Sequence, residues 1–402
     1  MSATLSIIIA TTAFVIAVRL KAPLGLSFAG CGILLGFLSG MSAVDVIMTT
    51  LRSIVMADTV KLIVIVYFLS LMGRLLTEMG WLSRTVTALQ RLIPIEKVSA
   101  VLPASIIGLL PMPGGAMLSA PLVQEGARSL DIDRGRLTFL NFWFRHIWEY
   151  AWPLYPGIVI STVLLSTPAS ELIASMWPLT IFAILPGFII GFRGVPKPQK
   201  AHENNISRGT AIRDFFLTSW YIWAVVIFVL FLGFEILPIV VMAGLITLLF
   251  LRQDDEKRIE HLKKNFSINI VTLIAGVMVF KGMLETGGSV ERLAVEMANV
   301  PDILILFIVP FAVGIITGVN SAFVGIGFPV LVPIIMRDGF SPGYFAFAYA
   351  AGFAGVLVSP VHLCLLLTKQ YFGAKWGEIY RFLVPATLIV FLAAIALFFI
   401  HG

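Results

Sequence analysis

The chain has 402 residues, of which 59% are hydrophobic and 12% are charged, with a net charge of +6 at pH 7 and a mean hydropathy of +0.98. Soluble domains carry about 25% charged residues, so this composition excludes an ordinary soluble protein. Outer-membrane barrels are excluded too, because their alternating strands of about ten residues do not occur here. We therefore expect an all-α polytopic membrane protein.

Long apolar segments alternate with short polar loops along the chain, and their lengths suit the roughly 17–25 residues that a helix needs to cross a bilayer. We predict about ten transmembrane helices; they lie at residues 4–20, 23–40, 60–79, 137–165, 175–193, 213–233, 236–251, 267–286, 343–372 and 377–400. The first helix has no basic residue before its apolar run and is followed by Arg19 and Lys21. This order predicts a retained helix with its N-terminus outside, and not a signal peptide.

The distribution of basic residues predicts the orientation of the chain. With the N-terminus outside, most of the 28 lysines and arginines lie in or beside cytoplasmic loops. We expect a multi-pass protein of the cytoplasmic (inner) membrane with both termini outside. Topology explains the positive net charge, so no nucleic-acid partner is expected. Because Cys31 and Cys364 both lie in apolar segments, we also predict no disulfide and no metal site.

Two further apolar segments, 98–126 and 301–336, contain proline and glycine breaks that predict re-entrant hairpins. The first carries "PMPGG", and a non-helical backbone inside a membrane is tolerated only when protein buries it or a wet cavity borders it. The second carries "GVNS", whose amide and hydroxyl groups suit a cation or an anion. The substrate-binding residues predicted at the two tips are Pro113, Gly114, Gly115, Ser119, Asn320 and Ser321. Gly318 and Asn320 are also assigned to ion coupling; kinked ordinary helices are the alternative.

A second break follows each hairpin, "WPLYPG" in the span 137–165 and "SP" at residues 359–360 in the span 343–372. Broken helices present N-termini with partial positive charge and unpaired N–H groups. If the four breaks converge, they would make a site for an anionic group, with exposed carbonyls for Na⁺. Ser359 and His362 are the substrate contacts predicted at the later break.

Ionisable residues inside membrane spans are uncommon and usually functional. His146 and Glu149 are therefore predicted to couple transport to Na⁺ or H⁺, and no other cofactor is expected. Arg145 and Glu149 are four residues apart, so an ion pair on one helical face is the alternative. The same spacing predicts interfacial ion pairs between Arg74 and Glu78 and between Lys281 and Glu285.

The two halves of the chain resemble each other at a shift of 208 residues. The matching pairs are Gly80 with Gly288, Arg84 with Arg292, and Pro121 with Pro329. We predict a first repeat at 1–193, a cytoplasmic linker at 194–212 and a second repeat at 213–402. Each repeat would hold five spans and one hairpin, so the second repeat would enter the membrane inverted. Inverted repeats with interrupted helices are typical of secondary transporters.

The segments "LLPMPGGAMLSAPLV", "RHIWEYAWPLYPG" and "SPVHLCLLLT" resemble an uncharacterised prokaryotic membrane family within the ion-transporter superfamily of secondary carriers. In the dicarboxylate symporters of that superfamily, hairpin tips carry Ser-Asn-Thr motifs that bind carboxylate and Na⁺. Asn320-Ser321 looks like a partial match, whereas "PMPGG" departs from the motif. The resemblance implies elevator-type transport, often by a homodimer.

We therefore expect a secondary active transporter of a small, organic anion coupled to Na⁺ or H⁺. An ion channel is the nearest alternative, since re-entrant hairpins also build selectivity filters. A membrane subunit of a larger transport assembly is another. An enzyme is not expected, because the sequence has no H-E-x-x-H, G-x-S-x-G or Walker motif. The sequence does not choose among carboxylates, sugar acids and oxyanions.

Overall fold

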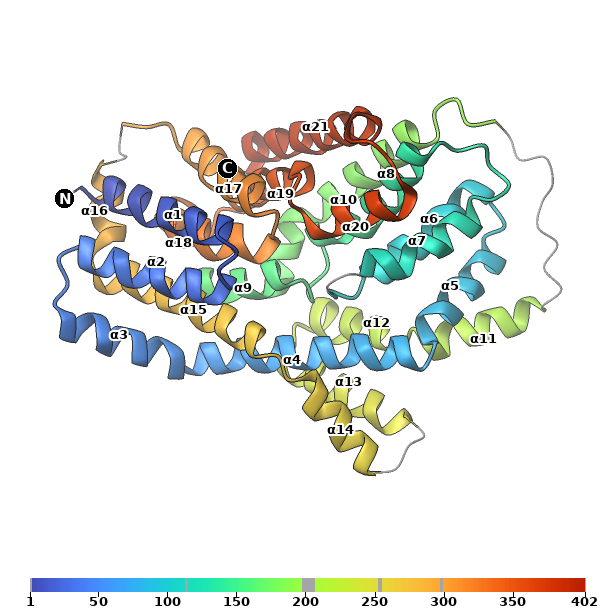
Figure 1. Ribbon diagram of the computed structural model, residues 1–402, viewed down its shortest axis with the longest axis horizontal. Coiled ribbons are helices and arrows are strands. Elements are labelled where there is room, and N and C mark those ends of the chain that lie inside the picture. Colours follow the sequence, from blue (N-terminus) through green and yellow to red (C-terminus); the bar gives the residue numbers. More distant parts are fainter. Residues whose placement is uncertain (1, 113–114, 197–206, 252–254, 297–298, 402) are drawn as a thin grey trace.

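The computed structural model describes residues 2–112, 115–196, 207–251, 255–296 and 299–401 (Figure 1). Within these ranges every regular element is a helix, and the only β contact is an isolated bridge between Arg337 and Gly339. This confirms the predicted all-α fold. The predicted linker 194–212 lies largely outside the described residues, and so do the predicted site residues Pro113 and Gly114.

The first half of the chain forms five helices before the first hairpin, then the hairpin, a broken helix and a long helix. Their bounds are α1 (Ala3–Arg19), α2 (Leu24–Leu38), α3 (Ala43–Val55), α4 (Ala57–Glu78), α5 (Trp81–Leu92), α6 (Glu96–Gly108), α7 (Gly115–Gly126), α8 (Arg134–His146), η1 (Ile147–Tyr150), α9 (Pro156–Leu165) and α10 (Ala169–Gly191). Pro156 opens α9 because proline lacks the N–H that a first helical turn leaves unpaired. The fifth of these helices, α5, is short and amphipathic.

The second half ends in the same order of elements. Its helices are α11 (Arg208–Thr218), α12 (Trp220–Val225), η2 (Val226–Phe231), α13 (Ile236–Phe250), α14 (Asp255–Asn265), α15 (Ile268–Thr286), α16 (Ser289–Glu296), α17 (Asp302–Thr317), α18 (Asn320–Ile335), α19 (Pro342–Val358), α20 (Leu363–Phe372) and α21 (Trp376–His401). Each half therefore closes with a hairpin, a broken helix and one long helix. Gly318 ends α17 in the left-handed conformation, with φ of 64°, and so reverses the chain at the hairpin tip.

Five helices of the described residues are long and apolar enough to cross a membrane by themselves, or six if the bent pair 208–218 and 220–231 is one span. Each of the ten predicted spans coincides with helical elements, but several are shorter apolar helices, among them α1, α2 and α13. The fold is that of a multi-pass membrane protein. The number of ten spans and the inverted relation of the two halves stay predictions.

The two halves interlock through their hairpins. In the first half α6 and α7 lie side by side, and α7 packs against α20 of the second half. Conversely, α18 of the second hairpin packs against α9 of the first half.

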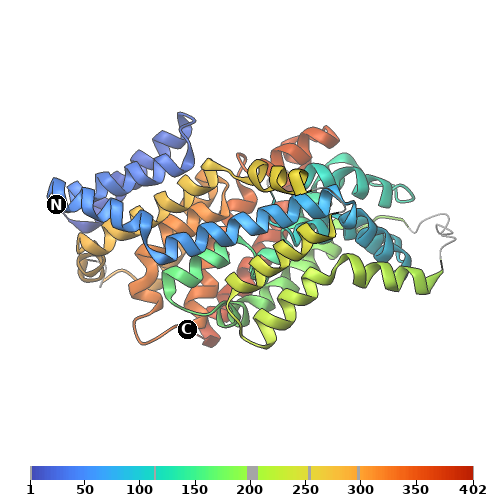
Figure 2. The same cartoon turned by 90° about the horizontal axis from the view of Figure 1, so that it is seen from below.

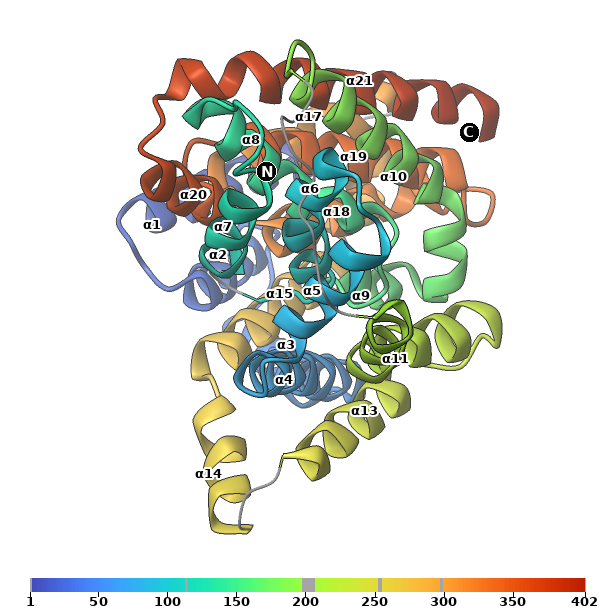
Figure 3. The same cartoon turned by 90° about the vertical axis from the view of Figure 1, so that its right-hand side faces the viewer.

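At the other end of the molecule α2 packs closely on α15, since a Cβ at Gly25 or Gly276 would overlap the opposite backbone. Long α4 crosses the face seen in Figure 2 beside α13. Figure 3 shows α14 on the side of the molecule opposite α21.

One of the two predicted interfacial ion pairs forms as expected. Lys281 Nζ lies 3.7 Å from Glu285 Oε1, within α15. The predicted Arg74–Glu78 pair is wrong within the described structure, because α14 brings His261 between them. Arg74 Nη2 donates to the His261 carbonyl at 2.9 Å, and Glu78 Oε2 lies 3.5 Å from His261 Nδ1. A tertiary contact has replaced the pairing that helical spacing favoured.

Candidate functional site

Four interruptions of the helical backbone meet inside the protein. They are the tip between α6 and α7, the turn between η1 and α9, the tip between α17 and α18, and the turn between α19 and α20. Around them lies a set of buried or partly buried polar side chains, which we call the central cluster. Its members are Arg145, His146, Glu149, Asn320, Tyr349, His362 and Cys364. Side chains from both halves of the chain therefore share one interior region.

The tip of the second hairpin is bound to the first broken helix. Asn320 Nδ2 donates to Glu149 Oε2 at 2.6 Å and to the hydroxyl of Tyr349 at 3.2 Å. Gly157, in the first turn of α9, lies directly against the same amide: a Cβ there would overlap Asn320 Oδ1 and lie 2.7 Å from the Tyr349 hydroxyl. Only glycine permits this approach. In the "YPG" sequence the proline therefore starts α9, and the glycine makes room for Asn320.

The two broken helices contact each other through histidines. His146 Nε2 and His362 Nε2 lie 3.3 Å apart, although the residues are separated by 216 positions. His146 Nδ1 lies 2.6 Å from the carbonyl oxygen of Phe142 one turn earlier. Gly318 packs on the later break, where a Cβ would lie 2.8 Å from the backbone nitrogen of His362. Ser359 Oγ donates to the Ile315 carbonyl at 2.7 Å, which ties that break to α17.

Arg145 is the only basic side chain other than histidine among the buried polar residues of the described structure, with 3% of its surface exposed. Its Nη2 donates to the Met112 carbonyl at 2.8 Å and its Nη1 to Cys364 Sγ at 3.6 Å, while Nε has no hydrogen-bond partner within the described residues. The Arg145–Glu149 ion pair, which was the alternative that helical spacing offered, does not form within the described residues. After His146 the chain winds as the 3₁₀ turn η1, in which a residue four positions on no longer shares the face of the first.

The first hairpin is held by carbonyl groups. The Tyr155 hydroxyl donates to the Gly108 carbonyl, and Trp148 Nε1 donates to the Ser105 carbonyl at 3.0 Å. Trp143 Nε1 donates to the Ala183 carbonyl at 2.8 Å. The aromatic side chains of this region therefore anchor neighbouring helices.

The structure brings most of the predicted site residues to the central cluster. Asn320, Glu149, His146, His362, Ser359 and Gly318 all lie at the breaks, and Gly115 faces Arg145 so closely that a Cβ would lie 2.5 Å from Nη2. Ser321 is buried in the first turn of α18. Ser119 is also buried, but its hydroxyl donates within its own helix, to Gly115 and Ala116 carbonyls. Whether these residues bind substrate or ions stays a prediction.

Sequence reasoning missed three residues that the structure places here: Tyr349, Cys364 and Asn141. Asn141 Nδ2 donates to the Ala116 carbonyl and to Thr368 Oγ1, both at 3.2 Å, and so joins α8 to α7 and α20. Tyr349 and Cys364 lie in apolar runs without any spacing signal. The one hint was that Cys364 follows His362 by two residues, next to a predicted break.

The backbone adds positive potential to the central cluster. Four helices begin there: α7 at Gly115 beside Arg145, α9 at Pro156 next to Gly157, α18 at Asn320, and α20 after His362. A helix N-terminus carries about half a positive charge and several unpaired N–H groups. With the Arg145 guanidinium, these four ends favour an anionic ligand. Glu149 supplies a carboxylate at the edge of the same region.

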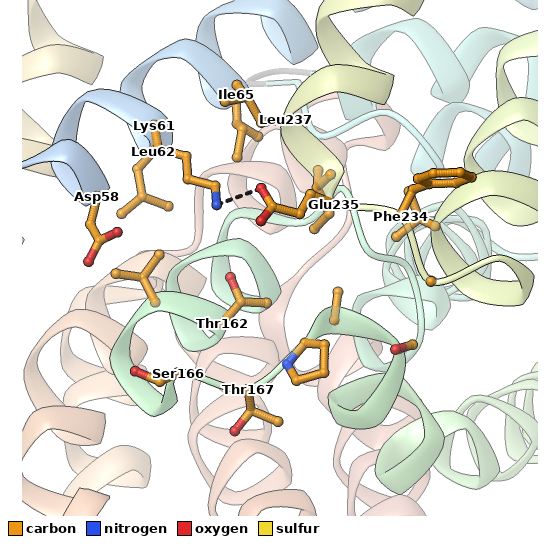
Figure 4. A pocket seen from close by; sticks show the side chains of 17 residues that line it. Asp58, Lys61, Leu62, Ile65, Thr162, Ser166, Thr167, Phe234, Glu235 and Leu237 are labelled. Atoms are coloured by element: carbon orange, nitrogen blue, oxygen red, sulfur yellow. Dashed lines mark ion pairs between the residues drawn. The ribbon is translucent and has the colours of Figure 1, made fainter.

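A cavity of about 300 Å³ with both polar and apolar lining residues lies at the opposite end of α9 (Figure 4). Lys61 Nζ of α4 and Glu235 Oε2 at the start of α13 form an ion pair of 2.8 Å on one wall. Thr162, Ser166 and Thr167 line the facing wall. Because α9 has 10 residues, its two ends are about 15 Å apart, so the cavity lies one short helix away from the central cluster.

Comparison with known proteins identifies a family and similar solved structures. The model of the family described as "Protein of unknown function (DUF401)" matches residues 2–400. No curated protein matches the chain. Among solved structures, the chain is similar to the YdaH transporter of Alcanivorax borkumensis, with 13% sequence identity, coverage of 88% of this chain and 86% of that chain, and a TM-score of 0.48.

Proposed function

This chain belongs to the DUF401 family of proteins of unknown function, and we propose that it is a secondary active transporter of a small organic anion, coupled to Na⁺ or H⁺. One observation carries the proposal: four helix N-termini and the Arg145 guanidinium meet in one buried region of an apolar, multi-helix protein. Such convergence of broken helices is typical of the substrate sites of secondary transporters.

The anion site is centred on Arg145. Burying a guanidinium removes its hydration at a cost of several kcal/mol, and a negative charge next to it offsets this cost. Arg145 Nη2 and Nη1 reach only a backbone carbonyl and a cysteine sulfur, and Nε is without a partner in the described structure. A carboxylate fits a guanidinium through two parallel hydrogen bonds. Gly115 lies directly against the guanidinium, so the N-terminus of α7 borders the same site.

The coupling site is centred on Glu149. Its Oε2 accepts from Asn320 of the second hairpin, and its Oε1 lies 3.7 Å from His146 Nε2. A Na⁺ bound to the carboxylate, or a proton shared with His146, would change the charge at the contact between hairpin and broken helix. Binding of the coupling ion and binding of the anion are then linked, because both act on the two tips.

The movement that exposes the site is of the elevator type. The hairpins and broken helices pack on one another across the two halves, α7 on α20 and α18 on α9, and so form one unit. Helices α4 and α13 form the wall across the cavity from α9 and α10, joined by Lys61 and Glu235. The unit slides along this wall between the two membrane faces, and a homodimer holds the wall in place.

The experiment that tests this function is uptake into proteoliposomes made with the purified protein. Dicarboxylates, tricarboxylates, sugar acids and inorganic oxyanions are offered in sodium and in choline buffer at two pH values. We expect saturable uptake of one anion class that requires Na⁺ or a pH gradient. Large unitary currents without saturation would instead identify a channel.

Binding is measured on the same preparation by thermal unfolding. A ligand of the folded state stabilises it by about 2.7 kcal/mol at 100 times its Kd. The anion that is taken up should raise the melting temperature, and only in the buffer that supports uptake. If none of these anions is taken up or shifts the melting temperature, the proposal is wrong.

A further inference from the structure

Three potential metal ligands lie together in the central cluster, although no spacing in the sequence connects them. They are His146 at the end of α8, His362 before α20 and Cys364 in the first turn of α20. One ring nitrogen of each histidine and the Cys364 sulfur all lie within 4.8 Å of one another, and all three residues are buried. Although the sequence led us to expect no metal site, we propose that they bind one transition-metal ion of the Zn²⁺ class, for which imidazole and thiolate are the characteristic ligands.

The distances suit a single tetrahedral ion. Zinc–nitrogen bonds are about 2.0–2.1 Å, which places two tetrahedral nitrogen ligands about 3.3 Å apart. His146 Nε2 and His362 Nε2 are 3.3 Å apart. A zinc–sulfur bond of about 2.3 Å places the sulfur about 3.6 Å from each nitrogen. Since the ligand atoms lie within 4.8 Å of one another, Cys364 Sγ has to approach by at most about 1.2 Å. Three protein ligands leave a fourth position for a small external ligand.

The hydrogen bonds of His146 favour the tautomer that binds a metal. The Phe142 carbonyl can only accept, so His146 Nδ1, 2.6 Å away, carries the hydrogen. The lone pair of a neutral His146 is then on Nε2, directed at His362. Metal-binding histidines commonly donate their other N–H to a carbonyl in this way, which sets the orientation of the ring. Glu149 Oε1 lies 3.7 Å from the same Nε2 and is a second electron-pair donor. A cation bound between His146 Nε2 and Glu149 Oε1 would interact favourably with both atoms.

The charges around the three ligands are compatible with a divalent ion. Arg145 Nη1 donates to Cys364 Sγ at 3.6 Å, so a metal-bound thiolate would keep a hydrogen-bond donor. The Cys364 thiolate and the Glu149 carboxylate together balance two positive charges. The Arg145 charge is then left for an anion. This inference does not depend on the transport function, because metal binding is measured without transport.

The test uses Co²⁺ as a probe for the untagged, metal-free protein in detergent, because Zn²⁺ has a filled d shell and gives no absorption. We expect one Co²⁺ per chain, a thiolate-to-cobalt charge-transfer band, and displacement of Co²⁺ by Zn²⁺. Cys364→Ser should abolish the band and weaken Co²⁺ binding by at least about 100-fold, since loss of a mere hydrogen-bond partner of a ligand weakens binding 10- to 100-fold.

The matched control is Cys31→Ser. Cys31 is the other cysteine, also buried, and its Sγ donates to the Ala10 carbonyl at 3.1 Å, away from the histidines. This variant should keep the band and the affinity. A wild-type protein without the band, or a Cys364→Ser variant that keeps it, overturns the proposal.

A second variant covers the case in which Cys364→Ser does not fold, judged by its elution profile and helical circular dichroism. His362→Gln retains the thiolate but lacks one imidazole. Its band should persist with Co²⁺ binding weakened at least about 100-fold; an unchanged affinity contradicts the proposed site. Failure of anion uptake, by contrast, bears on the transport proposal alone, because none of these readouts uses uptake.

Discussion

The two hairpins occupy corresponding places in the chain but are held by different chemistry. At the first tip the backbone supplies the acceptors: the Gly108 and Met112 carbonyls accept from Tyr155 and Arg145. At the second tip a side chain makes the contact, because Asn320 donates to Glu149 and Tyr349. The contacts of the first tip therefore do not depend on its own side chains, but they do depend on the residues that donate to its carbonyls. The contacts of the second tip depend on the Asn320 amide, and a ligand or ion that binds there can replace its partners Glu149 and Tyr349.

The largest expected effect is at the first hairpin, from Arg145→Gln. The change removes the charge of the proposed anion site together with the bidentate fork. A hydrogen bond to a charged group contributes about 1.5–3 kcal/mol, so anion affinity should fall about 10- to 100-fold. Thermal-shift titration with the transported anion measures it. Arg74→Gln is the control, because Arg74 binds the His261 carbonyl away from the central cluster. Equal anion affinity in wild type and Arg145→Gln would contradict the assignment.

The second hairpin is tested by Asn320→Ala, Glu149→Gln and the double variant. Asn320→Ala leaves a buried carboxylate without its 2.6 Å donor, and should lower the unfolding free energy by about 1.5–3 kcal/mol. Residues in contact show coupling energies of about 0.5–3 kcal/mol in such a cycle. Chemical unfolding of all four proteins gives the coupling. We also expect the Na⁺ or pH dependence of uptake to change in both single variants; additive effects with unaltered ion dependence would argue for packing alone.

Tyr155→Phe sharpens the comparison, because it removes one neutral hydrogen bond to the carbonyl tip and keeps the ring. The Gly108 carbonyl loses its donor, which should cost about 0.5–1.5 kcal/mol of stability with little change in ion dependence. Tyr221→Phe is the matched control: Tyr221 is buried, but its hydroxyl has no hydrogen-bond partner within the described residues. A Tyr155→Phe variant with altered ion dependence would show that the two tips are not separate in function.

The smallest effect is expected far from both hairpins, at the contact between α16 and α1. Glu296 accepts from the backbone N–H groups of Ala3 and Thr4 and from the Thr4 hydroxyl, and these bonds lower the pKa of its carboxyl. A lowered folded-state pKa means that this contact stabilises the protein above the unfolded value of about 4.3 and is lost as pH falls below it. Protection of the amides of residues 3–6 against hydrogen exchange, relative to their intrinsic exchange rates, should therefore fall below pH 4, whereas the protection in Glu296→Gln should not change over that range.

Most of the fold could be predicted from the sequence, because it depends on local composition. The apolar runs predicted helices at every expected span, and the "PMPGG", "GVNS", "WPLYPG" and "SP" breaks coincide with the interruptions found. The pairing of side chains was harder. Helical spacing predicted an Arg74–Glu78 pair and offered an Arg145–Glu149 pair as an alternative, and neither forms within the described residues. Glu149 instead accepts from Asn320, and Arg145 donates to the Met112 carbonyl. His261 contacts both Arg74 and Glu78.

By itself, the sequence determined that this is an apolar, multi-helix protein with four breaks, since hydropathy and the backbone chemistry of proline and glycine act over a few residues. Only the tertiary structure decided that the breaks meet, that Asn320 binds Glu149, and that His146, His362 and Cys364 converge. Those contacts join residues about 170 to 220 positions apart. They depend on how α7 packs on α20 and α18 on α9, which no local pattern of residues encodes.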